Sequence, residues 1–100
     1  MSTRTVYVLS GRFDTSTGEQ GLYDPKVFAK REDAERTMRA NAEEYVKRNW
    51  EYVASEPGTP FDEMISNCEE YKVDSFTAKV FMDNEGTWSK WMIDEVTVVE

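Results

Sequence analysis

The segment Arg31–Ser55 contains neither Gly nor Pro, and no other feature of the chain constrains the fold as much. On a helix, at about 100° per residue, its apolar side chains fall within one sector of about 120°. Glu32 and Asp33 lie in the first turn, where carboxylates suit the positive end of the helix dipole. The stripe consists of Ala34, Met38, Ala42, Tyr45, Val46, Asn49, Tyr52 and Val53. The sequence therefore predicts one long helix that ends before Pro57 and must bury this stripe against another surface.

Two strands are expected before this helix. Thr3–Phe13 carries the run Val6–Leu9, whose β-branched and aromatic side chains favour a strand with apolar groups on both faces. Lys26–Lys30 is a shorter candidate strand. The segment between them, Asp14–Pro25, is rich in Gly, Ser, Thr and Asp, so we expect a loop there.

A short second helix is expected after the long one. Thr59 can cap a helix that has Pro60 at its first position and runs to about Asn67. Asp62 then lies in the first turn, where its charge suits the helix dipole.

Two more strands are expected in the last third of the chain. Tyr71–Met82 alternates imperfectly and is read as one strand, and Asp83–Gly86 has the composition of a hairpin turn. Thr87–Val99 is read as the returning strand. Its apolar residues change face part-way along, which predicts a bulge near Asp94-Glu95.

The expected architecture is therefore a single α+β domain over residues 1–100, in the order ββα(α)ββ. We expect a four-stranded, mainly antiparallel sheet with the long helix packed on one face, because that arrangement buries the helix stripe.

Two segments resemble those of a type of small uncharacterised protein found in phages and mobile elements of bacteria. These are Val27-Phe28 leading into Glu32–Glu35, as "VF…EDAE", and the closing Trp91–Val96, as "WxIxEV". Proteins of this type also begin with a strand like Val6–Leu9. The resemblance implies an accessory protein of a mobile genome, and it carries over no activity, cofactor or catalytic residue.

Catalytic chemistry is difficult to build from this composition. The chain has no His, which removes the commonest general base and the His-containing zinc sites. Cys68 is the only cysteine, so an intramolecular disulfide is impossible and a reducing, cytoplasmic location is favoured. No phosphate-binding glycine loop or nucleophile motif is present. We therefore expect no enzyme, no cofactor and no metal site.

The net charge of −8 is carried by the last part of the chain. Residues 55–100 contain Lys72, Lys79 and Lys90 as their only basic residues against eleven acidic ones. This asymmetry suggests an acidic module that mimics phosphate and engages the basic surface of a nucleic-acid-handling protein, as an inhibitor or accessory factor. The proposed partner-binding residues are Glu69, Glu70, Asp74, Asp83, Glu85, Trp88, Trp91, Asp94 and Glu95.

Trp88 and Trp91 are three residues apart on the last strand, so they are expected on opposite faces. One can then lie in the core while the other serves as an exposed interface anchor, and packing of both is the alternative. For the carboxylates, the alternative is that they only keep a small protein soluble.

Other partners are constrained by the same composition. An acidic balance works against direct binding of nucleic acid and against anionic membranes, and no apolar run approaches the length of a membrane span. The main alternative function is self-assembly, in which an edge strand near either terminus pairs with its twin to give a homodimer.

Overall fold

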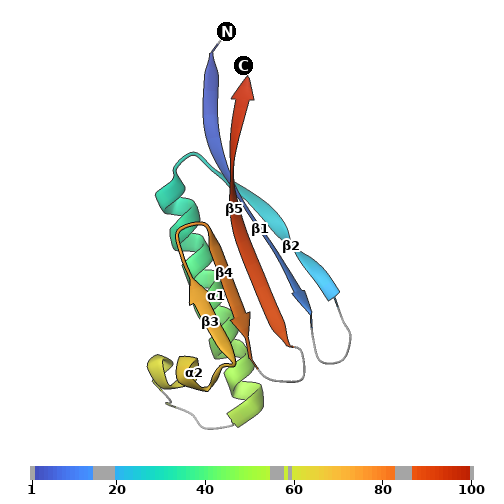
Figure 1. Ribbon diagram of the computed structural model, residues 1–100, viewed down its shortest axis with the longest axis vertical. Helices are drawn as coiled ribbons and strands as arrows, with labels where there is room; N and C mark the ends of the chain where they lie inside the picture. Colours follow the sequence, from blue (N-terminus) through green and yellow to red (C-terminus); the bar gives the residue numbers. More distant parts are fainter. Residues whose placement is uncertain (1, 15–19, 55–57, 59, 83–86, 100) are drawn as a thin grey trace.

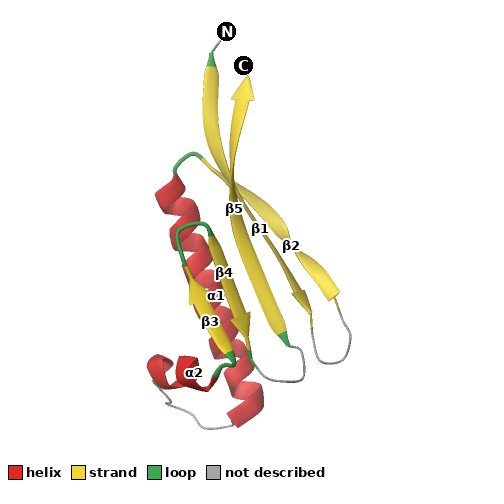
Figure 2. Ribbon diagram, viewed as in Figure 1, coloured by secondary structure: helices red, strands yellow, loops and turns green. Residues whose placement is uncertain are grey.

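The computed structural model describes residues 2–14, 20–54, 58, 60–82 and 87–99, without the side chains at 50–54 and 67. Its elements in chain order are β1 (Thr3–Asp14), β2 (Gln20–Phe28), α1 (Arg31–Ala54), α2 (Phe61–Asn67), β3 (Glu70–Val73), β4 (Thr77–Phe81) and β5 (Trp88–Val99). The strands form one antiparallel sheet in the order β2-β1-β5-β4-β3, and α1 covers one of its faces (Figures 1 and 2). The chain therefore has the expected α+β architecture, with five strands in place of the expected four.

The additional strand arises because the segment expected as one strand, Tyr71–Met82, is a hairpin. The Asp74 carboxylate accepts hydrogen bonds from the backbone N–H groups of Phe76 and Thr77, at 2.9 and 2.7 Å, and from the Thr77 hydroxyl at 2.8 Å. This Asx-type turn reverses the chain without Gly or Pro. The prediction of an uninterrupted strand was wrong for that reason.

The predicted loop Asp14–Pro25 is shorter than expected, because β2 already begins at Gln20 and continues through Pro25. Two residues of β2, Asp24 and Pro25, stand opposite the single residue Ser10 of β1, which makes a β-bulge. Because β2 is an edge strand, the missing N–H of Pro25 leaves no ladder position unpaired.

The bulge expected near Asp94-Glu95 is absent, since β1 and β5 pair without a register shift from Thr3↔Val99 to Asp14↔Trp88. The apolar residues change face because β5 runs beyond the end of the helix. Trp91 and Ile93 are buried beneath α1 and Val96 is 39 % exposed, and the end of β5 projects past the helix (Figure 1).

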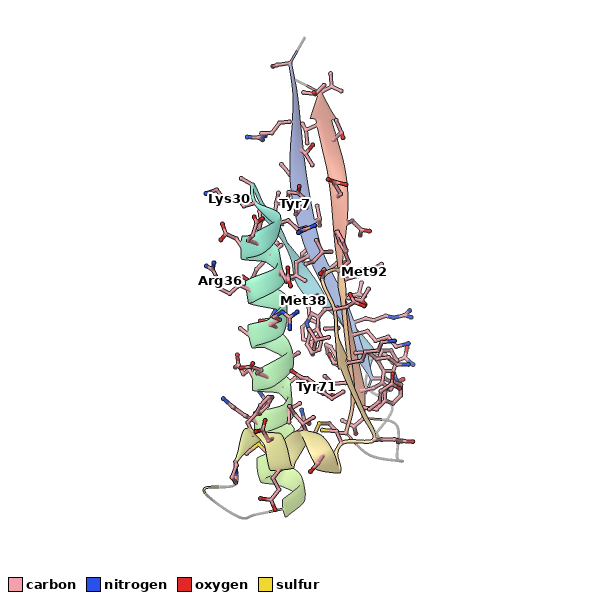
Figure 3. The ribbon with its side chains drawn as sticks, turned by 60° about the vertical axis from the view of Figure 1, so that its left-hand side comes forward. Tyr7, Lys30, Arg36, Met38, Tyr71 and Met92 are labelled. Atoms are coloured by element: carbon pink, nitrogen blue, oxygen red, sulfur yellow. The ribbon has the colours of Figure 1, made fainter. Side chains whose placement is uncertain are left out.

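The long helix was predicted correctly, and the described part of its stripe faces the sheet. Ala34, Met38, Ala42 and Val46 are fully buried and Tyr45 is 9 % exposed. Figure 3 shows Met38 between helix and sheet, and Arg36 on the opposite side of the helix. The expected stripe positions Tyr52 and Val53 lie outside the described side chains.

Trp91 lies at the centre of the layer between α1 and the sheet. Its ring stacks on Tyr23 of β2 at 5.5 Å and meets the edge of Tyr45 of α1 at 5.8 Å. Gly11 is paired with Trp91 across the strands, and a Cβ there would come within 2.7 Å of the Trp91 ring. Only a glycine therefore lets the indole lie against β1.

The short helix α2 follows the predicted range at Phe61–Asn67, but Pro60 is at its N-cap position and makes no side-chain cap bond. The predicted capping residue Thr59 lies outside the described residues. The Phe61 ring meets the edge of Tyr71 from β3 at 6.0 Å, so α2 closes the lower end of the core.

Candidate anion-binding face of the sheet

Within the part of the chain that the structure describes, no helix covers the face of the sheet that points away from α1 (Figure 2). Side chains alternate along a strand, so the neighbours of buried Leu9 and Trp91 lie on this open face. Met92 is one of them, and it is 48 % exposed. In Figure 3 it lies on the side of β5 away from the helix. We use "open face" for this surface of the five-stranded sheet.

Four basic side chains form one row across the open face. Arg12 of β1 pairs with Lys90 of β5, Lys90 pairs with Lys79 of β4, and Lys79 pairs with Lys72 of β3. Adjacent strands lie about 4.8 Å apart, so this cation row spans roughly 14 Å. Like charges directly opposite each other destabilise a sheet. The alignment of four in a chain of net charge −8 therefore needs an explanation.

Aromatic rings, rather than carboxylates, support most of the row. The Arg12 guanidinium carbon lies 5.7 Å and the Lys90 Nζ 5.0 Å from the centre of the Trp88 ring. The Lys79 Nζ lies 4.8 Å from the Phe81 ring, which stacks on Trp88 at 6.0 Å. A ring attracts a cation without cancelling its charge, so the row stays positive.

One carboxylate contacts the row among the described ion pairs. The Glu70 Oε2 lies 3.5 Å from the Lys79 Nζ, and both side chains are more than one-third exposed. An exposed pair of this kind contributes little stability. Glu70 therefore reduces the charge at Lys79, whereas Arg12 and Lys90 lie over the Trp88 ring.

A shallow cavity of about 690 Å³ lies over this part of the sheet. Its lining includes all four cations of the row, the apolar Leu22 and Met92, and the carboxylates of Glu70 and Asp74. Leu22 is 81 % exposed. The open face thus combines positive charge with exposed apolar surface in one hollow.

The predicted partner-binding carboxylates that the structure describes lie in two places, beside β3 and on β5. Glu70 and Asp74 lie at the β3 end of the cation row, and Glu69 is exposed just before β3. Asp94 and Glu95 are exposed on opposite sides of β5, and Glu95 accepts a 3.5 Å hydrogen bond from the Tyr7 hydroxyl. Asp83 and Glu85 lie outside the described residues.

The two tryptophans lie on opposite faces, as expected. Trp91 is 4 % exposed and belongs to the core beneath α1, so its surface is not available to a partner. Trp88 is half-buried on the open face, where its ring supports Arg12 and Lys90.

Sequence reasoning missed the row itself, although its signal is present. Lys72 and Lys79 lie at equal distances on either side of the Asp74–Thr77 reversal, so they face each other once that turn is recognised. The three lysines are also the only basic residues after position 54. By composition they indicate only a shortage of positive charge, because their alignment depends on strand register.

Cys68 and Asp74 are among the described groups with a shifted pKa, and each shift has a structural cause. Burial raises the pKa of the Cys68 thiol, so the reactive thiolate is disfavoured. Backbone N–H groups that donate hydrogen bonds to the Asp74 carboxylate lower its pKa, as expected for a carboxylate that stabilises a turn. Among the described residues no group of three or more His, Cys, Asp or Glu side chains is arranged to hold a metal ion.

Comparison with known proteins adds no relative: no family model, curated protein or solved structure matches this chain. The resemblance to small phage and mobile-element proteins therefore stays a prediction. None of the helices in the described residues is both long and apolar enough to cross a membrane.

Proposed function

We propose that this chain is a non-enzymatic binding module that holds the backbone of a single-stranded nucleic acid across the open face of its sheet. The observation that carries the proposal is the cation row, Arg12, Lys90, Lys79 and Lys72, in register on four adjacent strands. A linear polyanion crossing the strands would meet the four positive charges in succession and relieve their mutual repulsion.

The surroundings of the row favour nucleic acid over an acidic polypeptide. Exposed Leu22 and Met92 lie in the same hollow as the cations, and Trp88 and Phe81 form a stacked pair beside them. Single-stranded nucleic acids combine regularly spaced phosphates with flat apolar bases, which suits a surface that alternates cations with rings and apolar groups.

This proposal departs from the expectation that an acidic chain avoids nucleic acid. That expectation rests on net charge, whereas screening limits the reach of exposed charges to about 8 Å at physiological ionic strength. Groups within the row therefore dominate a bound phosphate. Glu70 and Asp74 in the same hollow, and carboxylates elsewhere on the chain, oppose its approach, so we expect moderate affinity and slow association.

Engagement of a basic, nucleic-acid-handling protein by the acidic residues remains a prediction from the sequence. Its carboxylates would have to act from separate places, since Glu70 and Asp74 flank the row while Asp94 and Glu95 lie further along β5. No distance or contact favours it over the open face.

The test is fluorescence anisotropy of labelled oligo-dT and oligo-U of about 12 nucleotides, titrated with the purified chain at several salt concentrations. We expect the double variant Lys79→Gln/Lys90→Gln to bind at least about tenfold more weakly. With at most four phosphates neutralised, log K should fall against log salt with a slope no steeper than about −3.

The matched control is Lys30→Gln/Arg36→Gln, which removes the same charge from exposed positions on the helix side of the molecule. The oligonucleotide affinity of this control should stay within about twofold of the natural sequence, because charges distant from the row are screened. Equal weakening by both variants, or absence of binding to either oligonucleotide, would overturn the proposal. Binding of labelled poly-glutamate alone would overturn it in favour of an acidic protein partner.

A further inference from the structure

The two long strands extend beyond the rest of the molecule as a two-stranded arm, made of Thr3–Val6 of β1 and Asp94–Val99 of β5. Pairing with β2 ends at Tyr7, and pairing with β4 begins at Met92. Figure 1 shows this part of β1 and β5 projecting past the end of α1, and the molecule measures 56 × 29 × 17 Å. A lone two-stranded ribbon is marginally stable in water, so the arm gains from a further strand.

The backbone groups that are free on the β5 side of the arm can be assigned. The Ile93 N–H donates to the Phe76 carbonyl at 2.7 Å, toward the β4 side. Since backbone groups alternate sides along a strand, Glu95, Thr97 and Val99 direct their N–H and C=O groups the same way. No described strand pairs with them there. They form a row of free donors and acceptors that can template another strand.

The outer strands of the sheet are protected in ways that the arm is not. β2 carries Pro25 and a bulge, and β3 is only four residues long. Both devices discourage pairing with another chain. The arm segment Asp94–Val99 has neither, and its Val96 and Val99 side chains are 39 % and 63 % exposed. The charged side chains of this segment, Asp94 and Glu95, lie at its start, and the exposed β-branched remainder is suited to a specific partner strand.

We infer that the partner is a second copy of this chain, with β5 paired antiparallel to its twin about a two-fold axis at Thr97. In this register Glu95 stands opposite Val99, Thr97 opposite Thr97, and Val99 opposite Glu95. Each of these is a hydrogen-bonded pair, so all the outward N–H and C=O groups of the three residues are satisfied. On the other face, Val96 stands beside Val98 and adds apolar cross-strand contact.

Neighbouring registers are less favourable. An axis at Val96 or Val98 leaves one of the three outward-facing residues without a matching partner. An axis at Glu95 places Thr97 opposite Ile93, whose N–H already donates to Phe76. The β4 strand pairs with β5 only as far as Met92. With the axis at Thr97, Met92 of the twin lies past the Val99 end of the paired segment. Its β4 therefore does not obstruct the pairing.

The experiment is sedimentation equilibrium of the full chain and two proline variants. Thr97→Pro removes an N–H that points away from β1, so the β1–β5 ladder is preserved. Thr5→Pro removes the corresponding N–H from the opposite edge of the arm, where Thr5 pairs with Thr97 across the ribbon. We expect the natural sequence and Thr5→Pro to sediment at twice 11.6 kDa. For Thr97→Pro we expect dimer dissociation to be raised at least about tenfold.

A disulfide test decides the register even if a proline variant fails to fold. In the Cys68→Ala background, Thr97→Cys should cross-link on oxidation, because a hydrogen-bonded antiparallel pair has Cα atoms about 5.5 Å apart, within disulfide range. Thr5→Cys should not cross-link. A mass of one chain at high concentration, an unchanged dimer in folded Thr97→Pro, or cross-linking through Thr5→Cys instead of Thr97→Cys would each overturn the inference.

Discussion

Trp88 and Trp91 stand three residues apart on β5 and belong to two different surfaces. Trp91 packs beneath α1 against Tyr23 and Tyr45 and excludes solvent. Trp88 lies half-buried on the open face with Arg12 and Lys90 over its ring. The same strands thus supply a core on one side and a charged, ring-supported surface on the other. Residues on opposite faces of one strand can therefore serve stability and recognition separately.

The largest test of this comparison is truncation of the two tryptophans. Trp91→Ala removes a buried ring and should lower the free energy of unfolding by about 3–5 kcal/mol, whereas Trp88→Ala should cost no more than about 2 kcal/mol. Urea denaturation followed by far-UV circular dichroism measures both. Similar losses for the two variants would show that the open face is as important to folding as the covered one.

A smaller effect is expected where β1 meets the Trp91 ring. The Cβ introduced by Gly11→Ala would lie 2.7 Å from the indole and 2.9 Å from the Lys90 carbonyl, and overpacking of this kind costs about 1–3 kcal/mol. Ser10→Ala, the neighbouring position on the open face, is the matched control and should change stability by less than about 0.5 kcal/mol. A neutral Gly11→Ala would contradict the packing described for Trp91.

The free energy of unfolding should also fall at alkaline pH, because of a tyrosine on the covered face. Burial raises the pKa of the Tyr23 hydroxyl, an effect only partly offset by its 2.7 Å hydrogen bond with Ser89. The unfolded chain therefore loses this proton first. The contribution of Tyr23 to the free energy of unfolding is fully present below about pH 10. It is lost as the pH rises, by at most about 1.4 kcal/mol per pH unit.

Urea midpoints measured from pH 8 to pH 11.5 test this. Tyr23→Phe should make the alkaline decline shallower, and Ser89→Ala, which keeps the titrating hydroxyl, should retain it. Tyr71, whose pKa is also raised mainly by burial, contributes a parallel decline in every variant that retains it. An unchanged slope in Tyr23→Phe would place the alkaline sensitivity elsewhere.

The smallest effect, and one of opposite sign, is expected at the end of the cation row. Lys72 is exposed and directly opposite Lys79, so Lys72→Thr should raise the free energy of unfolding by roughly 0.2–1 kcal/mol through relief of like-charge repulsion. Lys30→Thr, at an exposed position outside the sheet, is the control. A gain in stability together with weaker oligonucleotide binding would show that Lys72 serves binding and not folding. A loss of stability would show that the row is structural.

Much of the scaffold could be predicted because its signals are local. The stripe of α1 repeats with the helical period, and the long apolar runs of β1 and β5 mark strands over many residues. Predictions failed where a turn used uncommon chemistry. Asp74 reverses the chain through side-chain hydrogen bonds, and Asp24-Pro25, a common turn signal, forms a bulge inside an edge strand.

The candidate site could not be predicted for a different reason. Arg12, Lys72, Lys79 and Lys90 are separated by up to 78 positions in the sequence, and no periodic pattern connects them. They align only because three strand pairings have the registers they do. A shift of one residue in any of these would send a side chain to the opposite face.

Local spacing and composition are enough to predict that α1 is a long helix needing an apolar surface and that strands flank it. They also show that the chain lacks the histidines and cysteine pairs of common catalytic and metal sites. The tertiary structure alone decided which carboxylates disperse, which tryptophan is buried, and that the few lysines after position 54 join Arg12 in one row. The physical reason is that strand register relates distant residues, and register is set by the packing of the whole sheet.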